Sequence, residues 1–305
     1  MSFFSHPTVA RSVARLMQYG TAVGARRMTR SANERLPEFP RHAETLQVPT
    51  TFGSTRITAY RPESNESVRP VYVNLHGGGF VLSLTDYDDP ICRALAARSG
   101  AVVLNVEYVV APQHPFPAPP HHVYEILQWV VGNGSAHGWD GTRLAIGGQS
   151  AGGALAAAAA RLVLERGEPA IALQVLHYPP LDLTVPASAK PSPIAKPMLR
   201  PWMGEVFDNS YVPDPTDRAD RLVSPAGVAD TADLTGIAPA VVIAAENDIL
   251  RDEARRYAER LKQVGSLVEY HEVSGADHGY DVKDDERARS VYSMMASHIL
   301  RVTSA

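Results

Sequence analysis

Short apolar segments alternate with longer segments of helical character along most of the chain, and this alternation limits the possible folds more than any other sequence feature. A short apolar run predicts a strand that is buried on both faces, and such strands occur in parallel sheets covered by helices on each side. The predicted strands of this series are residues 71–75, 101–106, 144–146, 172–176, 240–245 and 267–273, and the predicted helices are residues 86–98, 121–131, 154–165, 252–264 and 285–300.

Two more strands are predicted before this series. Residues 44–49 and 54–60 are separated by a turn at Phe52-Gly53-Ser54, and strands joined so closely pair antiparallel. The sequence therefore predicts an α/β fold with a mostly parallel central sheet of about eight strands and helices on both faces.

One long segment interrupts the alternation. Residues 185–225 contain eight prolines and a single short helical candidate, residues 202–210. A connection of this length is usually a lid or a binding loop. We expect it to lie over the functional site.

The N-terminal segment is rich in arginine and has helical periodicity. Its apolar positions at helical spacing predict a helix packed on the domain. Five arginines precede the first acid, Glu34, so a targeting segment or a surface-binding helix is the alternative. The apolar positions are Val9, Val13, Leu16 and Met17, and the arginines are Arg11, Arg15, Arg26, Arg27 and Arg30.

The residues 147–153, Gly-Gly-Gln-Ser-Ala-Gly-Gly, follow a predicted strand and precede an alanine-rich predicted helix. A sharp strand-to-helix turn leaves no room for side chains beside the serine, which explains the small residues Gly148, Ala151 and Gly152. This turn places Ser150 at a helix N-terminus, where backbone N–H groups favour negative charge. The pattern predicts a nucleophile elbow with Ser150 as the nucleophile.

A serine nucleophile needs a base, and the base is usually a histidine oriented by a carboxylate. Asp248 and His278 each follow a predicted strand of the parallel series, so all three side chains lie at the carboxyl edge of the sheet. The order Ser150, Asp248, His278 is also that of α/β-hydrolases. Glu246 and Asp252 are rival candidates for the acid.

The residues His76-Gly77-Gly78-Gly79-Phe80 directly follow the predicted strand 71–75. Consecutive glycines let main-chain N–H groups approach the oxyanion that acyl transfer creates, and one such donor contributes about 3 to 4 kcal/mol. The N–H of Ala151 can add another donor. His76 precedes this loop, and we interpret it as orienting the loop and not as a catalytic residue.

In combination these motifs resemble the hormone-sensitive-lipase-like branch of the α/β-hydrolases from about residue 44 to the end. The resemblance implies an α/β-hydrolase fold with a helical cap built from residues 1–43 and 185–225, around a catalytic domain of residues 44–184 and 226–305. It also implies a carboxylesterase whose oxyanion donors are Gly78, Gly79 and Ala151. The motifs are His76–Phe80, Gly148–Gly153, Tyr178-Pro179 with Asp182, Asp248 with Leu250–Glu253, and Asp277-His278-Gly279.

The chain departs from the family pattern at three positions. Gln149 stands where the family usually has an acid, and Val109 and Gln113 stand where it usually has arginine and glutamate. Because one positive and one negative group are lost together, we hypothesise that neutral contacts replace an ion pair. These departures leave the Ser150, Asp248 and His278 set intact and affect substrate preference.

The substrate is predicted to be a small-molecule ester with a short- to medium-chain acyl group. Amidase, formamidase and lactonase activities use the same residues and are alternatives, and a non-catalytic small-molecule receptor is an alternative of another class. Five aromatic and apolar side chains are expected to line the acyl pocket: Phe80, Leu82, Trp202, Phe207 and Tyr211. The alternative interpretation is that they pack within the cap.

The composition disfavours several classes of binding partner and cofactor. A formal net charge of -4 disfavours nucleic acid, and no apolar run is long enough for a transmembrane segment. One cysteine, Cys92, excludes an internal disulfide and fits a reducing, cytoplasmic location. The histidines lack metal-binding spacing, so we expect no metal and no cofactor. From the family resemblance a homodimer through the last strand and helix is plausible.

Overall fold

The computed structural model describes residues 4, 6–63 and 68–303, and eight strands of these residues form one sheet in the order β1-β2-β4-β3-β5-β6-β7-β8. β1 pairs antiparallel with β2, β2 pairs antiparallel with β4, and all other neighbours are parallel. The predicted α/β fold with a mostly parallel sheet is confirmed. The strands are β1 Ala43–Thr50, β2 Gly53–Tyr60, β3 Arg69–Leu75, β4 Val102–Val106, β5 Trp139–Gln149, β6 Leu173–His177, β7 Ala240–Ala245 and β8 Leu267–Val273.

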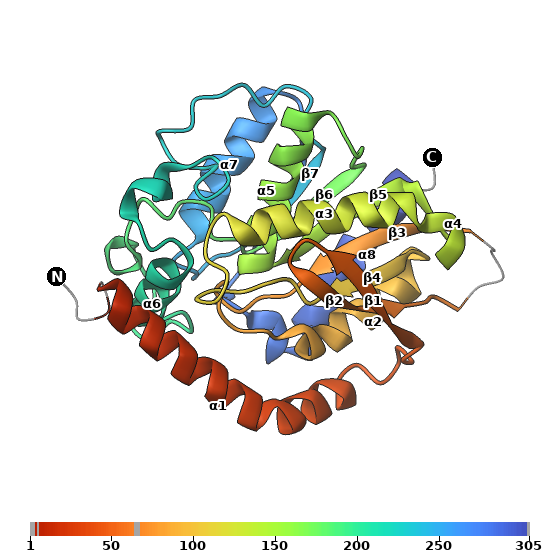
Figure 1. The fold of residues 1–305 in the computed structure, drawn as a ribbon, viewed down its shortest axis with the longest axis horizontal. Helices are drawn as coiled ribbons and strands as arrows, with labels where there is room; N and C mark the ends of the chain where they lie inside the picture. Colours follow the sequence, from red (N-terminus) through yellow and green to blue (C-terminus); the bar gives the residue numbers. More distant parts are fainter. Residues whose placement is uncertain (1–3, 5, 64–67, 304–305) are drawn as a thin grey trace.

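Helices cover both faces of the sheet (Figure 1). One face packs against α3, α5 and α7, and the other packs against α2 and α8, so that two hydrophobic cores enclose the buried strands. The helices are α1 Pro7–Glu34, α2 Asp89–Ser99, α3 Ala118–Gly132, α4 Gly134–His137, α5 Ala151–Arg166, α6 Pro201–Tyr211, α7 Arg251–Gln263 and α8 Asp285–Thr303, with short 3-10 helices at η2 Thr85–Asp88, η3 Ala187–Ala189, η4 Pro215–Ala219 and η5 Tyr280–Val282.

The strand predicted at residues 144–146 is longer in the structure. β5 continues through Gly147 and Gly148 to Gln149, because its parallel pairing with β3 and β6 extends that far. The two glycines resemble a turn in sequence, yet they permit close packing: a Cβ at Gly148 would lie 2.3 Å from the main-chain oxygen of Leu75. β5 therefore carries the chain directly to Ser150.

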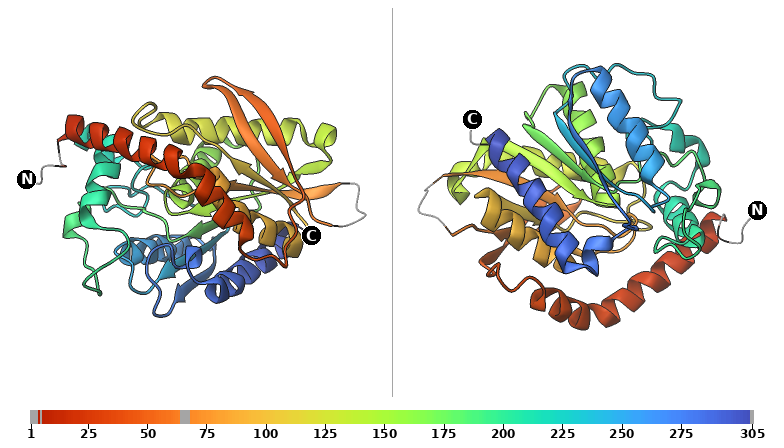
Figure 2. Two further views of the ribbon diagram at one scale, coloured as in Figure 1. Left: turned by 90° about the horizontal axis from the view of Figure 1, so that it is seen from below. Right: turned by 180° about the vertical axis from the view of Figure 1, so that it is seen from behind.

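The helix α1 crosses the molecule along one side and meets α6 near its N-terminal end (Figures 1 and 2). Its inner face buries the small residues Ala10 and Ala14, with Val13 and Met17 partly buried beside them. The prediction for Leu16 is wrong, since that side chain is 69% exposed. It lies on the opposite face of the helix from the two alanines.

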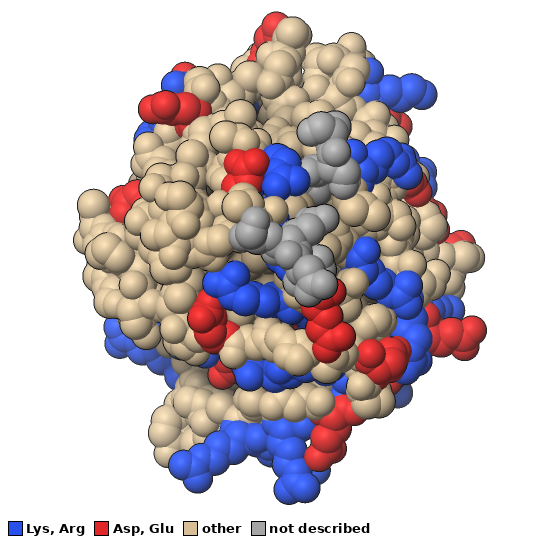
Figure 3. Space-filling model, turned by 90° about the vertical axis from the view of Figure 1, so that its right-hand side faces the viewer, with Lys and Arg blue, Asp and Glu red and all other residues tan. Residues whose placement is uncertain are grey.

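The arginines of α1 predicted from the sequence are exposed in the structure. Lys and Arg side chains gather at the lower end of the molecule in Figure 3, on the side where α1 lies in Figure 1. Binding of a surface by this face stays a prediction. Among the residues that the structure describes, every helix is too short or too polar to span a lipid bilayer.

The proline-rich segment contains η3, α6 and η4 and lies at the end of the molecule where α1 begins (Figure 1). α6 packs against both α1 and η3. The main-chain N–H of Met198 donates to the Asp277 carboxylate at 2.6 Å, so this segment is attached to the loop that carries His278. Division of the chain into cap residues 1–43 and 185–225 around a catalytic domain stays a prediction.

Candidate active site

Ser150 lies at the sharp turn between the end of β5 and the start of α5. Its backbone has φ 53° and ψ −121°, a region that non-glycine residues rarely adopt. The turn is held because the Ser150 N–H donates to the His177 carbonyl at 2.9 Å. Glycine is required at position 152, where a Cβ would lie 1.9 Å from the Leu75 main-chain oxygen. The strained turn projects Ser150 into a cavity at the carboxyl edge of the sheet.

The structure brings His278 and Asp248 to Ser150. His278 Nε2 is 3.0 Å from Ser150 Oγ, and His278 Nδ1 is 2.6 Å from Asp248 Oδ2. Asp248 follows β7 and His278 follows β8, and both side chains are buried. These contacts have the geometry of a nucleophile, its base and the group that orients the base.

The rival acids are engaged elsewhere. Glu246 accepts hydrogen bonds from the Ser274 hydroxyl at 2.9 Å and the Gly275 N–H at 2.6 Å. Asp252 forms an ion pair with Arg251 at 3.0 Å. Of the three acids considered from the sequence, Asp248 is the one that contacts His278.

The protonation of His278 reflects two opposing influences. Burial lowers the pKa of His278, but the charge of Asp248 and its hydrogen bond outweigh burial, so the pKa lies above its ordinary value. Asp277 and Asp281 raise it further. The carboxylate thus favours the imidazolium that forms when a histidine accepts a serine proton.

The glycine loop lies beside Ser150. A Cβ at Gly77 would lie 3.6 Å from Ser150 Cβ, and Gly78, Gly79 and Phe80 all have positive φ, at 128°, 60° and 62°. Within the described part of the chain, the main-chain N–H groups of Gly78, Gly79 and Ala151 have no hydrogen-bond acceptor. Unpaired donors next to a serine hydroxyl are suited to binding an oxyanion.

His76 is buried beneath this loop and fixes its shape. Its ring stacks on Tyr108 with centroids 4.2 Å apart, and Nδ1 lies 2.6 Å from the Gly77 carbonyl oxygen. The Tyr108 hydroxyl donates to the His76 carbonyl at 2.8 Å. Burial lowers the pKa of His76 to about 4, so the ring is neutral at pH 7 and Nδ1–H donates to Gly77. These contacts agree with the orienting role predicted from the sequence.

A cavity of about 320 Å³ opens onto Ser150, His278 and the glycine loop. Among the side chains predicted to form the substrate pocket, Phe80, Leu82 and Phe207 line it. Phe207 also packs against the glycine loop, since a Cβ at Gly79 would lie 2.3 Å from its ring. Helix α6, in the segment predicted to form a cap, therefore contributes directly to the cavity wall.

The structure places the other two predicted pocket residues, Trp202 and Tyr211, outside this cavity lining. Trp202 is 43% exposed and packs on Phe4, with ring centroids 5.7 Å apart. Tyr211 is buried at the end of α6 and stacks on Phe80 with centroids 4.0 Å apart. The aromatic spacing in the sequence did not distinguish the face of α6 that meets the cavity from the faces that meet solvent and core.

Sequence reasoning missed the polar part of the cavity lining. Lys190 and Asp208 come from the proline-rich segment, and Lys190 forms a buried ion pair with Glu253 at 2.6 Å. Asp88 of η2 also lines the cavity. None of these belongs to a motif, so only the acidic composition of residues 86–89 gave a signal.

The N-terminal helix also reaches the cavity. Met28 of α1 and Arg35, which follows it, are lining residues. Arg35 binds the Asp285 carboxylate at 2.6 Å and the Asp281 carbonyl at 2.6 Å. Among the described residues no three His, Cys, Asp or Glu side chains are grouped as a metal site requires.

Two of the departures from the family pattern have defined partners. The Gln113 amide donates to Gln18 Oε1 of α1 at 2.9 Å, a neutral contact. The Gln149 amide lies between Asn74 and Asp88. Val109 is half-buried, and its N–H donates to His122 Nδ1 at 3.0 Å.

Comparisons with known proteins agree with this geometry. The family described as the alpha/beta hydrolase fold matches residues 72–282. The chain is 37% identical to the carboxylesterase NlhH of Mycobacterium tuberculosis over 73% of this chain and 70% of the relative, and 33% identical to an ethyl acetate hydrolase of Pseudomonas putida over 77% and 74%. A solved esterase of Pyrobaculum calidifontis superposes with a TM-score of 0.84 and 34% identity, covering 96% of this chain and 94% of that one.

Proposed function

Since the chain belongs to the hormone-sensitive-lipase-like branch of the α/β-hydrolases and is a carboxylic ester hydrolase, we propose that it cleaves short- to medium-chain acyl esters through Ser150, His278 and Asp248. The observation that carries this proposal is the continuous path of hydrogen bonds from Asp248 through His278 to Ser150 Oγ. The relatives are named as esterases, which disfavours the receptor alternative.

In the proposed reaction Ser150 Oγ attacks the ester carbonyl carbon as His278 Nε2 takes its proton. The carbonyl oxygen becomes an oxyanion, which the N–H groups of Gly78, Gly79 and Ala151 stabilise. Protonated His278 then gives its proton to the departing alkoxide, leaving an acyl group on Ser150. A water molecule, deprotonated by His278, attacks this acyl-enzyme and releases the carboxylic acid and free Ser150.

The cavity supports the proposed chain length. Its volume of about 320 Å³ is at the low end of small-molecule sites, and Phe80, Leu82 and Phe207 restrict it beside the glycine loop. The name ethyl acetate hydrolase, carried by the Pseudomonas putida relative, also favours a short acyl chain. Amides and lactones use the same residues and are tested as alternative substrates.

Hydrolysis of p-nitrophenyl esters of increasing chain length, by the wild type and by Ser150→Ala, tests the proposal. We expect the substitution to lower kcat by about 10⁵- to 10⁶-fold, since loss of a nucleophile removes the action of the whole set. The wild-type kcat/KM should peak at short to medium chains. Comparable turnover of a long-chain triglyceride emulsion would contradict the predicted chain length, and faster cleavage of matched amides or lactones would favour those alternatives.

We also propose a reducing, cytoplasmic location and a homodimer formed through β8 and α8. The single buried Cys92 supports the location. β8 ends the sheet order, and Val268 on β8 and Leu300 on α8 are 42% and 45% exposed, which supports the interface. Analytical ultracentrifugation should give twice the chain mass for the wild type and the chain mass for Val268→Lys. A wild-type monomer would refute the dimer.

A further inference from the structure

Beneath the nucleophile, three buried side-chain amides connect a main-chain carbonyl to the carboxyl group of Asp88. Asn105 of β4 contacts the Thr85 carbonyl oxygen at 2.7 Å and Asn74 of β3 at 3.0 Å. Asn74 continues to Gln149 of β5 at 3.0 Å. The other end of the Gln149 amide lies 2.7 Å from Asp88 Oδ2. Which end of each amide is oxygen and which is nitrogen is assigned from the donors and acceptors that it faces.

The Thr85 carbonyl fixes the arrangement because it only accepts hydrogen bonds. The NH₂ group of Asn105 must face it, so the oxygen of Asn105 faces Asn74. Asn74 then presents its NH₂ to Asn105 and also to Asp88 Oδ2 at 3.0 Å, which leaves its oxygen facing Gln149. Gln149 presents its NH₂ to that oxygen. Its own oxygen is therefore the atom 2.7 Å from Asp88 Oδ2.

In the orientation described above, the Gln149 oxygen also lies 3.2 Å from the Leu75 main-chain oxygen. The other orientations bring two oxygens closer together than this. Turning Gln149 alone places its oxygen 3.0 Å from the Asn74 oxygen. Turning all three amides places the Asn105 oxygen 2.7 Å from the Thr85 carbonyl. Asn74 and Asn105 have no solvent exposure, so neither mismatch is relieved by water. A buried polar group without a partner costs about 1 to 3 kcal/mol.

We infer that Asp88 is a neutral carboxylic acid in the active enzyme and that its proton is donated to the Gln149 side-chain oxygen, making Asp88 a positioning residue for the Ser150 turn. This inference rests on the proposed role of Ser150. Position 149, where the family resemblance leads us to expect an acid, is here an amide, and the neighbouring carboxyl group is that of Asp88 on η2.

The surroundings of Asp88 favour the neutral acid. Burial raises the pKa of Asp88 to about 7, the hydrogen bond from Asn74 lowers it, and the negative charge of Asp281 raises it. Asp281 is itself held by the Tyr178 and Tyr292 hydroxyls at 2.8 Å each. The nearby cation Arg35 is engaged by Asp285. Burial raises the pKa of the other titratable neighbours, which are therefore neutral: Tyr72, Tyr87, Cys92, Tyr108 and Tyr292.

The effect of the Asp88 proton on Ser150 is transmitted through the position of Gln149. Gln149 is the last residue of β5 and directly precedes Ser150. Its carbonyl oxygen also supports the glycine loop, because a Cβ at Gly77 would lie 3.3 Å from it. Ionisation of Asp88 would leave a carboxylate against the Gln149 oxygen and displace both the nucleophile and the loop. We therefore expect kcat to fall as Asp88 ionises, with little change in KM.

Infrared spectroscopy tests the protonation directly and independently of catalysis. At a pH below 7 the wild type should show the carbonyl band of a buried, protonated carboxyl group, and this band should disappear as the pH rises above 7. Burial also raises the pKa of Glu253 to about 7 and that of Asp208 to about 6, so these two groups add carbonyl bands of their own. The band of Asp88 is the part of the wild-type spectrum that Asp88→Asn should lack at every pH. If wild type and Asp88→Asn have the same carboxyl spectrum, the inference is wrong, whatever the outcome for Ser150.

The pH profile of kcat tests the positioning role. In the wild type kcat should fall at alkaline pH in parallel with the infrared band, by up to about tenfold per pH unit. Asp88→Asn places an NH₂ group at the position of Oδ2, where it donates to the Gln149 oxygen at every pH but also faces the NH₂ of Asn74 at 3.0 Å. Its kcat should therefore be lower than that of the wild type at acidic pH, and it should not fall at alkaline pH as the wild-type kcat does. The matched control is Asp86→Asn, an exposed aspartate of the same turn, which should keep the wild-type profile.

If Asp88→Asn does not fold, the variant Gln149→Glu tests the same inference. Gln149→Glu places two carboxyl groups in contact, and these share a proton, so the infrared band and the alkaline fall of kcat should both move to higher pH. An alkaline limb that does not move in either variant would overturn the positioning role, even if the band is present.

Discussion

In the proposed mechanism His278 must be neutral to accept the Ser150 proton, so we expect its ionisation to determine the acidic side of the pH profile. Burial alone would lower the pKa of His278, whereas the charge and hydrogen bond of Asp248 raise it above the ordinary value. Activity is therefore present above this raised pKa and is lost as the pH falls through it. The buried carboxylate of Asp248, with smaller contributions from Asp277 and Asp281, makes His278 a stronger base and restricts it to a higher pH range.

Replacing Asp248 separates its effect on the pKa of His278 from its effect on the reaction rate. In Asp248→Asn the charge that raises the pKa of His278 is gone, so the acidic limb of kcat/KM should move to lower pH. The rate on its plateau should fall by about 10³- to 10⁴-fold, because the wrong tautomer of His278 is favoured. Glu246→Gln is the control, since Glu246 binds Ser274 and Gly275 instead. An unchanged acidic limb in Asp248→Asn would contradict this account.

The side chain of Gln18 joins the N-terminal helix α1 to the region of the glycine loop by hydrogen bonds. Its amide donates to the carbonyls of Val81 at 2.8 Å and Ala111 at 3.0 Å, and it exchanges hydrogen bonds with Gln113. Val81 follows the loop directly. The neutral Gln113 thus connects the element predicted to form part of the cap to the loop predicted to bind the oxyanion.

This contact refines the hypothesis about Val109 and Gln113. Gln113→Glu alone removes the donor to Gln18, and Val109→Arg alone introduces an unpaired charge at a half-buried position. We expect each single change to destabilise the protein by about 1 kcal/mol or more, and the double variant to be less destabilised than the sum of the two. Denaturant unfolding measures this. An equal loss of unfolding free energy in all three variants would refute the hypothesis.

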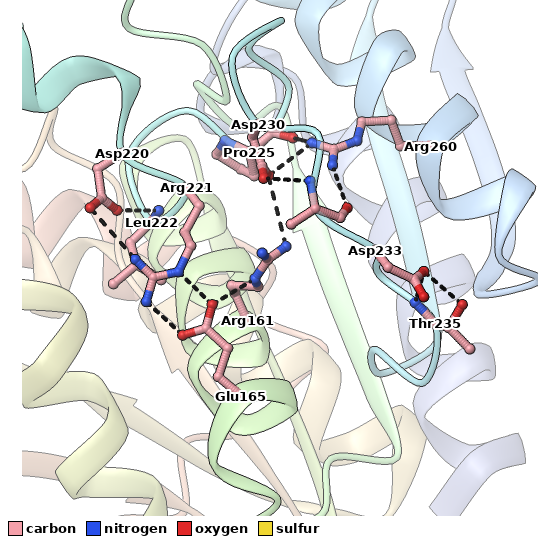
Figure 4. Close-up of polar contacts among 11 residues, drawn as sticks. Arg161, Glu165, Asp220, Arg221, Leu222, Pro225, Asp230, Asp233, Thr235 and Arg260 are labelled. Atoms are coloured by element: carbon pink, nitrogen blue, oxygen red, sulfur yellow. Dashed lines mark hydrogen bonds and ion pairs between the residues drawn. The ribbon is translucent and has the colours of Figure 1, made fainter.

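Ion pairs and hydrogen bonds attach residues 220–235, which lead from the proline-rich segment toward β7, to helices α5 and α7 (Figure 4). Glu165 of α5 accepts hydrogen bonds from Arg161 at 2.9 Å and from Arg221 at 2.6 Å. Arg260 of α7 binds Asp230 at 2.9 Å and the Ala232 carbonyl at 3.1 Å. Arg161 lies 3.8 Å from Asp230, which connects the two halves. The network thereby joins α5 and α7 through the segment that follows the predicted cap insertion.

Removing Glu165 should weaken the whole molecule in a pH-dependent way. The hydrogen bond from Arg221 lowers the pKa of Glu165 to about 2, so its stabilisation is complete above pH 4.5 and is lost as the pH falls toward 2. At neutral pH Glu165→Gln should cost about 1 to 3 kcal/mol, because Arg161 is largely buried.

Thermal unfolding over a pH series measures this difference. The Tm difference between the wild type and Glu165→Gln should shrink as the solution becomes more acidic. Asp233→Asn is the control, since within the described residues Asp233 forms its hydrogen bonds in its own turn, with Thr235. A Tm difference that does not change with pH would contradict the electrostatic explanation.

Local patterns in the sequence were enough to predict the parallel sheet, the turn at Ser150 and the loop at Gly77 to Gly79. Each is specified within a few residues: apolar runs form buried strands, and glycine is required where a Cβ meets neighbouring main chain, as at Gly152. Asp248 and His278 were found because residues that follow parallel strands share one edge of the sheet. The structure shows Asp248 in contact with His278 and His278 in contact with Ser150, and their catalytic roles stay predictions.

Tertiary structure alone decided what depends on contacts between distant segments. Helical periodicity could not show which face of α6 meets the cavity, so Trp202 and Tyr211 were placed there in error while Asp208 was missed. Nor could it show that Leu16 faces solvent. The contact between Asp88 and Gln149 joins residues 61 positions apart on η2 and β5, and no local pattern encodes it. Such contacts arise from packing, which a linear sequence specifies only through the folded chain.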